Sequence, residues 1–527
     1  PPPGPAVGPT ALIAQVAERL ATSYDPVHAG FGHAPKFPHP SGLSFLLWSS
    51  FATGDARSAA RARETLLRMA DGGLFDQLGG GFHRYSVDEG WHVPHFEKMA
   101  IDNAALLGTY VEGAARFADA RLEETAGRTA RWIVEVLERT DGGFGASQDA
   151  DNAPGDDGRF FTWSRAELRA ILSEDELKAV TRHFGIGTEG RMPQDPDQNV
   201  LYRLMPVAEV ARTIGRPVEE VERTIAGATA KMQEARARRP VPFVDPARYG
   251  LINGALIGAL SRAGRFLGDP RPIASARRAA DAFLERGFDR ARGVAHRLGT
   301  DGGHGFGLLE DNAAFALGLV ELAGATAEPR YAVAAGQLLS LISGSFSDGS
   351  GVLTDVAPAL YEGPVVGALD EPVHPIEDAP NLSPNALVAI ALVRWSSLAQ
   401  DDSALDRARA LVEGLARRLD GAGIFAAGAA WAGGLAETPP ARVVIEGDGP
   451  AAEALARAAE RGFHPNLWVF RGPPPAPFSM PEELARAAAG RSTGARALVC
   501  FGTRCRAPIT DPAELAAAIA SADRPSR

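Results

Sequence analysis

Apolar residues recur every three or four positions through most of the chain, in long alanine-rich segments. This spacing places them on one face of a helix, so it predicts a mainly α protein. Glycine-rich turns followed by an aromatic or aliphatic residue separate the segments, as in "GGGF" at Gly79 and "GGFG" at Gly142. The expected helices are Thr10–Tyr24, Gly42–Thr53, Ala56–Ala70, His95–Ala115, Arg121–Glu138, Val218–Arg238, Leu251–Leu267, Ala274–Arg286, Leu308–Leu322, Tyr331–Ser343, Ser383–Leu398 and Ala404–Leu419.

A shorter repeat indicates how these helices pack. "IDNAALLG" at Ile101 has a near copy, "EDNAAFALG", at Glu310, and "LINGALIG" at Leu251 and "SPNALVAI" at Ser383 are weaker relatives. On a helical wheel, the segment from residue 95 is apolar all round except in its first turns. Such a helix is typical of the inner layer of a helical barrel, where its polar end opens on a central pocket. Repeated hairpins favour a closed ring over an irregular bundle. We predict an (α/α)6 toroid over residues 10–432, after a linker over residues 1–9.

The pattern changes after Gly433. "ARVVIEG", "NLWVFRG" and "ARALVCFG" read as short strands, with helices "AAEALARAAERG" and "PEELARAAAG" between them. Alternating strands and helices predict a small α/β module with a partly parallel sheet over residues 433–527. "GDGPAA" at Gly447 resembles a dinucleotide fingerprint, but the next strand ends in Arg471 and Gly472 instead of the acidic residue that binds ribose. We therefore expect no dinucleotide cofactor.

The composition limits the kinds of binding partner that we expect for the protein. The net charge of −11 argues against nucleic acid. No run of 18 apolar residues occurs, so we expect no membrane span. Two cysteines, Cys500 and Cys505, are too few for a disulfide scaffold or a zinc site, and they suit a reducing compartment such as the cytoplasm. The opening "PPPGPAVGPT" lacks the features of a signal peptide.

The densest chemistry lies in "DQLGGGFHRYSVDEGWHVPHFEKMAIDN", from Asp76 to Asn103. A histidine moves protons near neutrality, so His83 and His95 are candidate catalytic residues, with Asp102 as their partner. Pro94 fits a first helical turn, so we expect a helix to begin there. The alternative is that these groups only cap a helix. The candidate ligand-binding residues of this stretch are Arg84, Tyr85, Trp91, Glu97, Lys98 and Asn103.

A second cluster lies in "GGFGASQDADNAPGDDGRFFTW". Asp149 and Asp151 are candidate general acids, and Trp163 is a candidate ligand-binding residue. Asp156 and Asp157 are expected in a solvated turn. The loop fails the calcium-binding EF-hand pattern.

A third candidate for ligand binding is Asp311, with helix capping as the alternative. His92 and His95 resemble a pair of metal ligands, but Pro94 breaks the helical register between them, so we expect no metal.

Several stretches resemble the YyaL-like family, which includes spermatogenesis-associated thioredoxin-domain proteins. They are "AGFGHAPKFPHP" at Ala29, the stretch from Asp76 quoted above, "DNAALL" at Asp102, "GGFGASQDAD" at Gly142 and "LVCFGTRCRAPITDP" at Leu498. The resemblance implies a thioredoxin-like domain followed by a six-hairpin barrel similar to N-acylglucosamine 2-epimerases and glycosidases. No C-x-x-C occurs, so we expect the thioredoxin-like unit to be missing.

The chain also departs from the family pattern. Ile252 stands where a Trp is usual and Ala247 where a Lys is usual, which puts part of a family site in doubt. The resemblance by itself assigns no catalytic residue.

Two classes of function follow. An enzyme acting on a sugar-like metabolite would use His83 and His95 as an acid–base pair for epimerisation or isomerisation, or two carboxylates for hydrolysis. A non-catalytic module would bind a carbohydrate or a protein. A central pocket lined by His83, His95, Asp102 and Asp149 would favour the enzyme, whereas a pocket plugged by side chains would favour the module.

Overall fold

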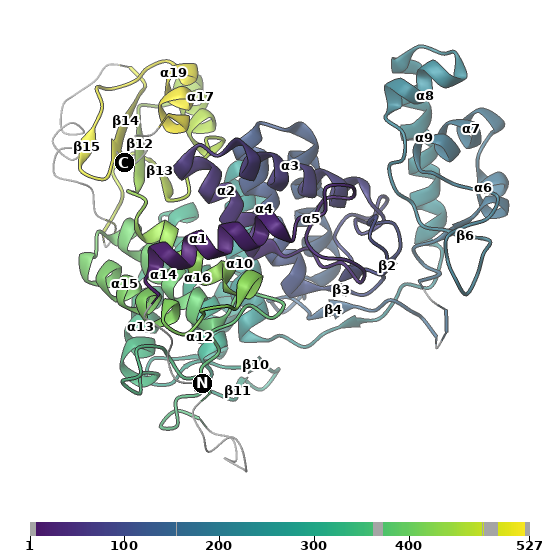
Figure 1. Ribbon diagram of the computed structural model, residues 1–527. Helices are drawn as coiled ribbons and strands as arrows, with labels where there is room; N and C mark the ends of the chain where they lie inside the picture. Colours follow the sequence, from purple (N-terminus) through teal and green to yellow (C-terminus); the bar gives the residue numbers. More distant parts are fainter. Residues whose placement is uncertain are drawn as a thin grey trace.

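A computed structural model describes residues 7–153, 155–156, 158–361, 373–476, 478 and 494–521. Its main body is a ring of helical hairpins, drawn at the centre of Figure 1. Each inner helix packs on the next, and α4 closes the circle between α2 and α10. The inner helices are α2 (Pro40–Thr53), α4 (Ala100–Phe117), α10 (Gly250–Leu267), α12 (Leu309–Thr326), α14 (Pro384–Ala399) and α16 (Ala427–Ala436). The predicted (α/α)6 toroid is confirmed.

An outer helix packs on each inner one. The outer helices are α1 (Pro9–Thr22), α3 (Ala56–Asp71), α5 (Ala120–Trp132), α11 (Pro270–Arg286), α13 (Pro329–Ser345) and α15 (Asp402–Ala416). Inner helices such as α12 and α14 are buried on nearly all sides, whereas α3 and α5 alternate buried and exposed positions at helical spacing. Small residues allow the inner layer to pack closely. A Cβ on Gly318 of α12 would lie 2.3 Å from the carbonyl oxygen of Gly254 on α10, so these positions require glycine.

The repeated asparagines hold the ring to its turns. Asn103 Oδ1 accepts from the backbone N–H of Phe82 at 2.7 Å, and Asn103 Nδ2 donates to the Phe82 carbonyl at 2.8 Å. The same two bonds recur between Asn253 and Phe144 and between Asn385 and Leu353. Asn312 likewise accepts from the backbone N–H of Val294, but its Nδ2 donates to the Leu308 carbonyl. These four "asparagine clamps" explain the asparagine repeat and the glycine–apolar turns as one device. All four asparagines lie on inner helices, as predicted.

The expected helix start near Pro94 is wrong. Helix α4 begins at Ala100, and the residues before it form short strands. β2 (Pro94–His95) pairs antiparallel with β1 (Tyr85–Ser86), and β3 (Lys98–Met99) pairs with β4 (Ser147–Gln148). Proline fixes a φ that suits an extended chain as well as a first helical turn, so Pro94 did not discriminate between them. His95 and Lys98 therefore do not share a helical face with Asp102.

A helical insertion interrupts the ring between α5 and α10. It contains α6 (Arg165–Ile171), α7 (Glu174–His183), α8 (Val207–Ile214) and α9 (Val218–Ala237), which lie together away from the ring in Figure 1. Leu168, Val180 and Met232 belong to a separate core in this unit. Its two ends meet where β4 pairs with β7 (Val244–Asp245). The sequence analysis did not separate this unit from the barrel.

The last part of the chain forms a four-stranded sheet in the order β13-β12-β14-β15. β12 (Ala441–Glu446) is parallel to β13 (Leu467–Arg471) and antiparallel to β14 (Arg496–Phe501), which pairs with β15 (Arg504–Cys505). Helices α17 (Gly449–Glu460) and α19 (Pro512–Ala520) accompany the sheet. The three predicted strands are present and the sheet is partly parallel. The predicted helix "PEELARAAAG" lies outside the described residues, and the domain limit at residue 433 stays a prediction.

A disulfide joins Cys500 to Cys505 across β14 and β15. The pair lies in register on the two strands, so it links neighbouring positions of one sheet edge.

Candidate functional site

A cavity of about 400 Å³ runs through the centre of the ring. Ile101, Leu251, Glu310 and Ser383 border it near the first turns of their helices. Eleven positions further along each of these four helices, at residues 112, 262, 321 and 394, the lining is charged. At about 1.5 Å per residue, the two levels lie about 16 Å apart. The cavity therefore has a mouth at the N-terminal ends of the inner helices and a floor near their C-terminal ends.

The floor carries four charges of alternating sign around the ring. Glu112, Arg262, Glu321 and Arg394 each lie nine positions after the clamping asparagine of their helix. Arg262 Nη2 donates to Glu112 Oε1, and Arg394 donates to Glu321 through Nε at 2.7 Å and Nη2 at 3.2 Å. Burial would raise the pKa of Glu321, but the charges of Arg394 and Arg262 outweigh it and lower that pKa. The floor is therefore a mutually neutralised network.

The C-terminal unit closes the ring behind this floor. Arg394 Nη1 donates to the carbonyl of Pro465, which borders the cavity. The Arg394 guanidinium also lies 4.0 Å from the ring centre of Trp468, whose Nε1 donates to Ser397 Oγ at 2.6 Å. A second, smaller cavity of about 80 Å³ is bordered by the same four charged residues and by His464. The C-terminal unit thus supplies part of the cavity wall.

A histidine–carboxylate pair lies beside Glu310, which borders the cavity, although neither His296 nor Asp311 borders it. His296 Nδ1 is 3.0 Å from Asp311 Oδ2, and Asp311 Oδ1 accepts from the backbone N–H of Leu251 at 2.7 Å. Asp311 is fully buried, whereas 39% of the His296 side chain is exposed. The bond to Asp311 raises the pKa of His296, and burial raises the pKa of Asp311. This pair can accept a proton and hold it near neutral pH.

Glu310 belongs to the same group and borders the cavity. Burial and the neighbouring charge of Asp311 raise its pKa. One ligand atom from each of His296, Glu310 and Asp311 lies within 4.8 Å of the others, so the three together could hold a metal ion. The arrangement offers a base, a partner that fixes its tautomer, and a carboxyl group able to carry a proton.

A related arrangement occurs at α4, two hairpins before α12 in the ring. Asp102 precedes Asn103 as Asp311 precedes Asn312, and Arg84 follows its clamped residue by two positions, as His296 does. Arg84 Nη1 lies 3.4 Å from Glu97 Oε2. Burial raises the pKa of Asp102 to about 6, although the charge of Arg84 opposes the shift. The repeat thus places a second ionisable group next to Ile101, which lines the cavity.

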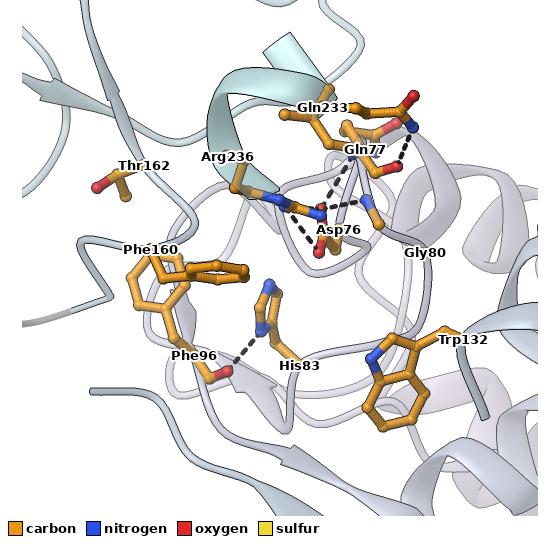
Figure 2. Close-up of polar contacts among 12 residues, drawn as sticks. Asp76, Gln77, Gly80, His83, Phe96, Trp132, Phe160, Thr162, Gln233 and Arg236 are labelled. Carbon is orange, nitrogen blue, oxygen red and sulfur yellow. Dashed lines mark hydrogen bonds and ion pairs between the residues drawn. The ribbon is translucent and has the colours of Figure 1, made fainter. Parts of the chain in front are cut away.

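The predicted catalytic His83 does not border the cavity, and its ring faces the carbonyl of Phe96 (Figure 2). It is 2% exposed, its Nδ1 is 2.7 Å from the Phe96 carbonyl, and its ring contacts those of Phe96 and Phe161 edge-on. Burial and the charge of Lys98 lower the pKa of His83 to about 3. His83 is therefore a buried neutral side chain at physiological pH.

Next to His83 lies a buried ionic cluster around Asp76. Lys98 Nζ donates to Asp76 Oδ2 at 2.8 Å and to the Gly80 carbonyl at 2.8 Å. Arg236 of helix α9 reaches the same carboxylate through Nη1, at 2.8 and 3.0 Å (Figure 2). Burial lowers the pKa of Lys98 to about 8. Lys98, a predicted ligand-binding residue, is thus buried in an ionic cluster in which Arg236 joins the insertion to the ring.

The other predicted residues are dispersed. His95 stacks on Tyr85, with ring centres 5.2 Å apart. Trp91 is 1% exposed and Trp163 is 2% exposed. The Asn103 amide is occupied by the backbone, as described above. The carboxylate of Asp151 accepts from the Gly158 N–H, and only the backbone of Asp149 has a described contact, with Phe243.

The catalytic candidates in the stretch from Asp76 to Asn103 were expected to line the central cavity, and this expectation is wrong. Neither His83, His95 nor Asp102 borders the cavity, and nor do Asp149 and Asp151. Of that stretch only Ile101 borders the cavity, and Ala104 and Ala105, which follow it on α4, border the cavity too. Asp157 lies outside the described residues.

The sequence analysis missed His296 and the charged floor. "GVAHRLG" around His296 follows the same glycine–apolar turn that precedes Arg84. The floor residues could have been found by counting nine positions from each repeated asparagine.

The chain is similar to curated proteins over almost its whole length. It is 29% identical to human (Homo sapiens) spermatogenesis-associated protein 20, over 94% of this chain and 68% of the human protein. The chain is a homologue of spermatogenesis-associated protein 20. The mouse (Mus musculus) spermatogenesis-associated protein 20 is 28% identical over 94% of this chain, and the uncharacterized protein B0495.5 of Caenorhabditis elegans is 26% identical over 76% of it. The family resemblance drawn from the sequence is confirmed.

Solved structures with distant sequences share parts of the fold. A D-mannose isomerase matches 77% of this chain and 84% of its own, with a TM-score of 0.46 and 12% identity. An unsaturated glucuronyl hydrolase specific for heparin matches 77% of this chain and 82% of its own, with a TM-score of 0.43 and 10% identity. No protein-family model matches the sequence. None of the helices in the described part of the chain combines the length and apolarity needed to cross a membrane.

Proposed function

We propose that the ring binds a small sugar-like molecule in its central cavity and that His296 moves a proton on it, as in an aldose–ketose isomerase or epimerase. The observation that carries this proposal is the His296–Asp311 pair, which lies beside Glu310 at the border of the cavity. The cavity volume of about 400 Å³ lies in the range of about 300–1,000 Å³ that small-molecule sites occupy. The lining mixes apolar surface with a few polar groups, which suits a molecule having both C–H and O–H groups.

The roles follow from the contacts. Asp311 accepts the Nδ1 proton of His296, which leaves Nε2 as the basic atom. Nε2 takes the proton from the carbon next to the sugar carbonyl, and Asp311 stabilises the imidazolium that forms. Glu310, whose pKa is raised, supplies a proton to the carbonyl oxygen. Return of the proton from Nε2 to the former carbonyl carbon, while the Glu310 carboxylate takes the proton of the adjacent hydroxyl, completes isomerisation. Epimerisation requires the enediol to turn its other face to Nε2; the proton then returns to the same carbon, and Glu310 takes back the proton that it gave to the carbonyl oxygen.

Arg84 and Asp102 are proposed as ligand-binding groups by their repeat relationship to His296 and Asp311, and Glu97 is proposed with them through its ion pair with Arg84. A second candidate is glycoside hydrolysis, which is favoured by one specific observation. Asp102, which follows the lining residue Ile101, and Glu310, which borders the cavity, both have raised pKa values, as a general acid requires.

Proton exchange tests the proposal directly. The protein is incubated with neutral aldoses and ketoses in D2O, and NMR records both deuterium at the carbon next to the carbonyl and new isomers. We expect exchange by the native protein and a loss of about 10²–10⁴-fold in the variant His296→Gln. His304→Gln is the matched control, because His304 forms an exposed pair with Asp301 in the same loop region. The same spectra detect hydrolysis of disaccharides.

The assay runs with and without EDTA, because His296, Glu310 and Asp311 could hold a metal ion. Exchange that persists fully in His296→Gln would contradict the assigned role of His296. Absence of exchange and of hydrolysis across the panel would contradict catalysis by the ring.

A further inference from the structure

We propose that the central cavity selects neutral or amino sugars and rejects sugars that carry a carboxylate or a phosphate. This inference rests on the proposed function and adds a substrate class to it. It is drawn from the charges that border the cavity, above all the four charges of the floor.

The floor offers an anion no unpaired cation. Among the described lining residues, the guanidinium groups are those of Arg262 and Arg394. Arg262 is paired with Glu112, and Arg394 is paired through two nitrogens with Glu321. A third nitrogen of Arg394 donates to the Pro465 carbonyl. An entering carboxylate would have to displace one of these buried carboxylates, which would leave an uncompensated charge inside the protein.

The mouth adds negative charge. Glu310 and Glu377 also border the cavity, so the described lining holds four glutamates against two arginines. His296, which lies beside Glu310, is paired with the buried carboxylate of Asp311. Even with Glu310 protonated, as its role as a proton donor requires, Glu377 leaves the described lining with a net negative charge, so the cavity repels an anion and attracts an ammonium group.

A neutral polyol meets suitable partners instead. Carboxylate oxygens accept hydrogen bonds from hydroxyl groups, and Ser44 already donates to Glu112 Oε2 at 2.8 Å at the floor. The apolar walls at Ile101, Leu251 and Trp431 can pack against the C–H faces of a sugar ring. Hydroxyl groups need no net charge from the site, so the neutralised floor is compatible with them.

A charge-matched panel tests the inference. The probes are glucose, glucosamine, glucuronate and glucose 6-phosphate, with the corresponding mannose and galactose series, and binding is measured by equilibrium dialysis at pH 7.5. We expect the neutral or amino member of at least one series to bind at least tenfold more tightly than its uronate and phosphate. Tighter binding of the uronate or the phosphate would overturn the inference and leave sugar binding intact. Absence of binding by every probe would overturn the proposed function and this inference with it.

Variants of the floor residues test the inference independently. Glu112→Gln releases Arg262, and Glu321→Gln releases Arg394, so each should raise the affinity for the uronate relative to the neutral sugar by at least tenfold. Two variants are used so that one can fail to fold without ending the test. The control is Glu413→Gln, which makes the same charge change in an exposed pair with Arg417 on α15. If the affinity for the uronate relative to the neutral sugar is the same in both floor variants as in the control, the ion pairs of the floor do not set the selectivity.

Discussion

The guanidinium of Arg394 on α14 faces the carboxylate of Glu321 on α12 through two hydrogen bonds, of 2.7 and 3.2 Å. Both side chains are less than 10% exposed. Each residue lies nine positions after the asparagine that clamps its own hairpin, so the repeat that builds the ring also sets the level at which the two charges meet. The geometry of the fold and the chemistry of the cavity floor therefore have one origin.

Breaking this pair should destabilise the protein strongly. Glu321→Ala leaves the Arg394 guanidinium buried without its carboxylate, and we expect the free energy of unfolding to fall by about 3–5 kcal/mol. Urea denaturation followed by circular dichroism measures the change. Glu413→Ala, in the exposed pair with Arg417, should change it by less than about 1 kcal/mol. The double variant Glu321→Ala/Arg394→Ala should lose less than the two single losses combined, and simple additivity would contradict a paired role.

The His296–Asp311 pair should make stability depend on pH. The bond to Asp311 raises the pKa of His296 in the folded state above its unfolded value of about 6.5. The stability gained from protonated His296 is therefore fully present below about pH 6.5 and is lost as the pH rises through the folded-state pKa. We expect the melting temperatures of the native protein and His296→Gln to differ most below pH 6.5 and to converge above it. A difference that grows with pH would contradict this sign.

Replacing one of the clamping asparagines should destabilise the protein locally. Asn253→Ala removes the partners of both backbone groups of Phe144, which are buried. An unsatisfied buried group costs about 1–3 kcal/mol, so we expect a loss of at least that size. Asn152→Ala is the control, because Asn152 is an exposed loop residue that bonds the Pro240 carbonyl. Hydrogen exchange should show faster exchange at Phe144 in Asn253→Ala, and unchanged protection there would refute the clamp.

The insertion should loosen when Arg236 is replaced. Burial would raise the pKa of Asp76, but the charges of Arg236 and Lys98 outweigh it and hold that pKa well below its usual value. The contact therefore persists above about pH 4 and weakens only as the pH falls through the depressed pKa. At pH 7, Arg236→Met should increase proteolysis within residues 149–243, whereas Arg238→Met, in an exposed pair with Glu234, should not. Identical cleavage of both variants would contradict a docking role for Arg236.

The ring could be predicted because its signal is repeated. Four copies of an asparagine followed by small and apolar residues indicated inner helices, and each copy lies on one. The insertion was missed for a physical reason. Helix α9 buries one face and exposes the other, just as the outer helices of the ring do, so periodicity cannot tell which core a helix covers.

The site was harder to predict than the fold. His83 and His95 stand in a stretch rich in ionisable groups, but density along the chain does not show where side chains point. The loop folds back so that His83 packs on Phe96 and Phe161, while His95 stacks on Tyr85. His296 stands in an ordinary loop, and its chemistry arises from Asp311, fifteen residues later. Such a pair can be recognised only once the structure shows that the turn lies beside the helix that follows it.

The last hairpin of the ring differs from the others, because α1 packs against α16 although the two helices come from distant parts of the sequence. Every other outer helix follows its inner partner directly in the chain. The first and last helices of the ring thus meet without a covalent connection between them. A disulfide engineered across α1 and α16 would therefore join the two ends of the ring covalently and turn an open chain of hairpins into a closed loop.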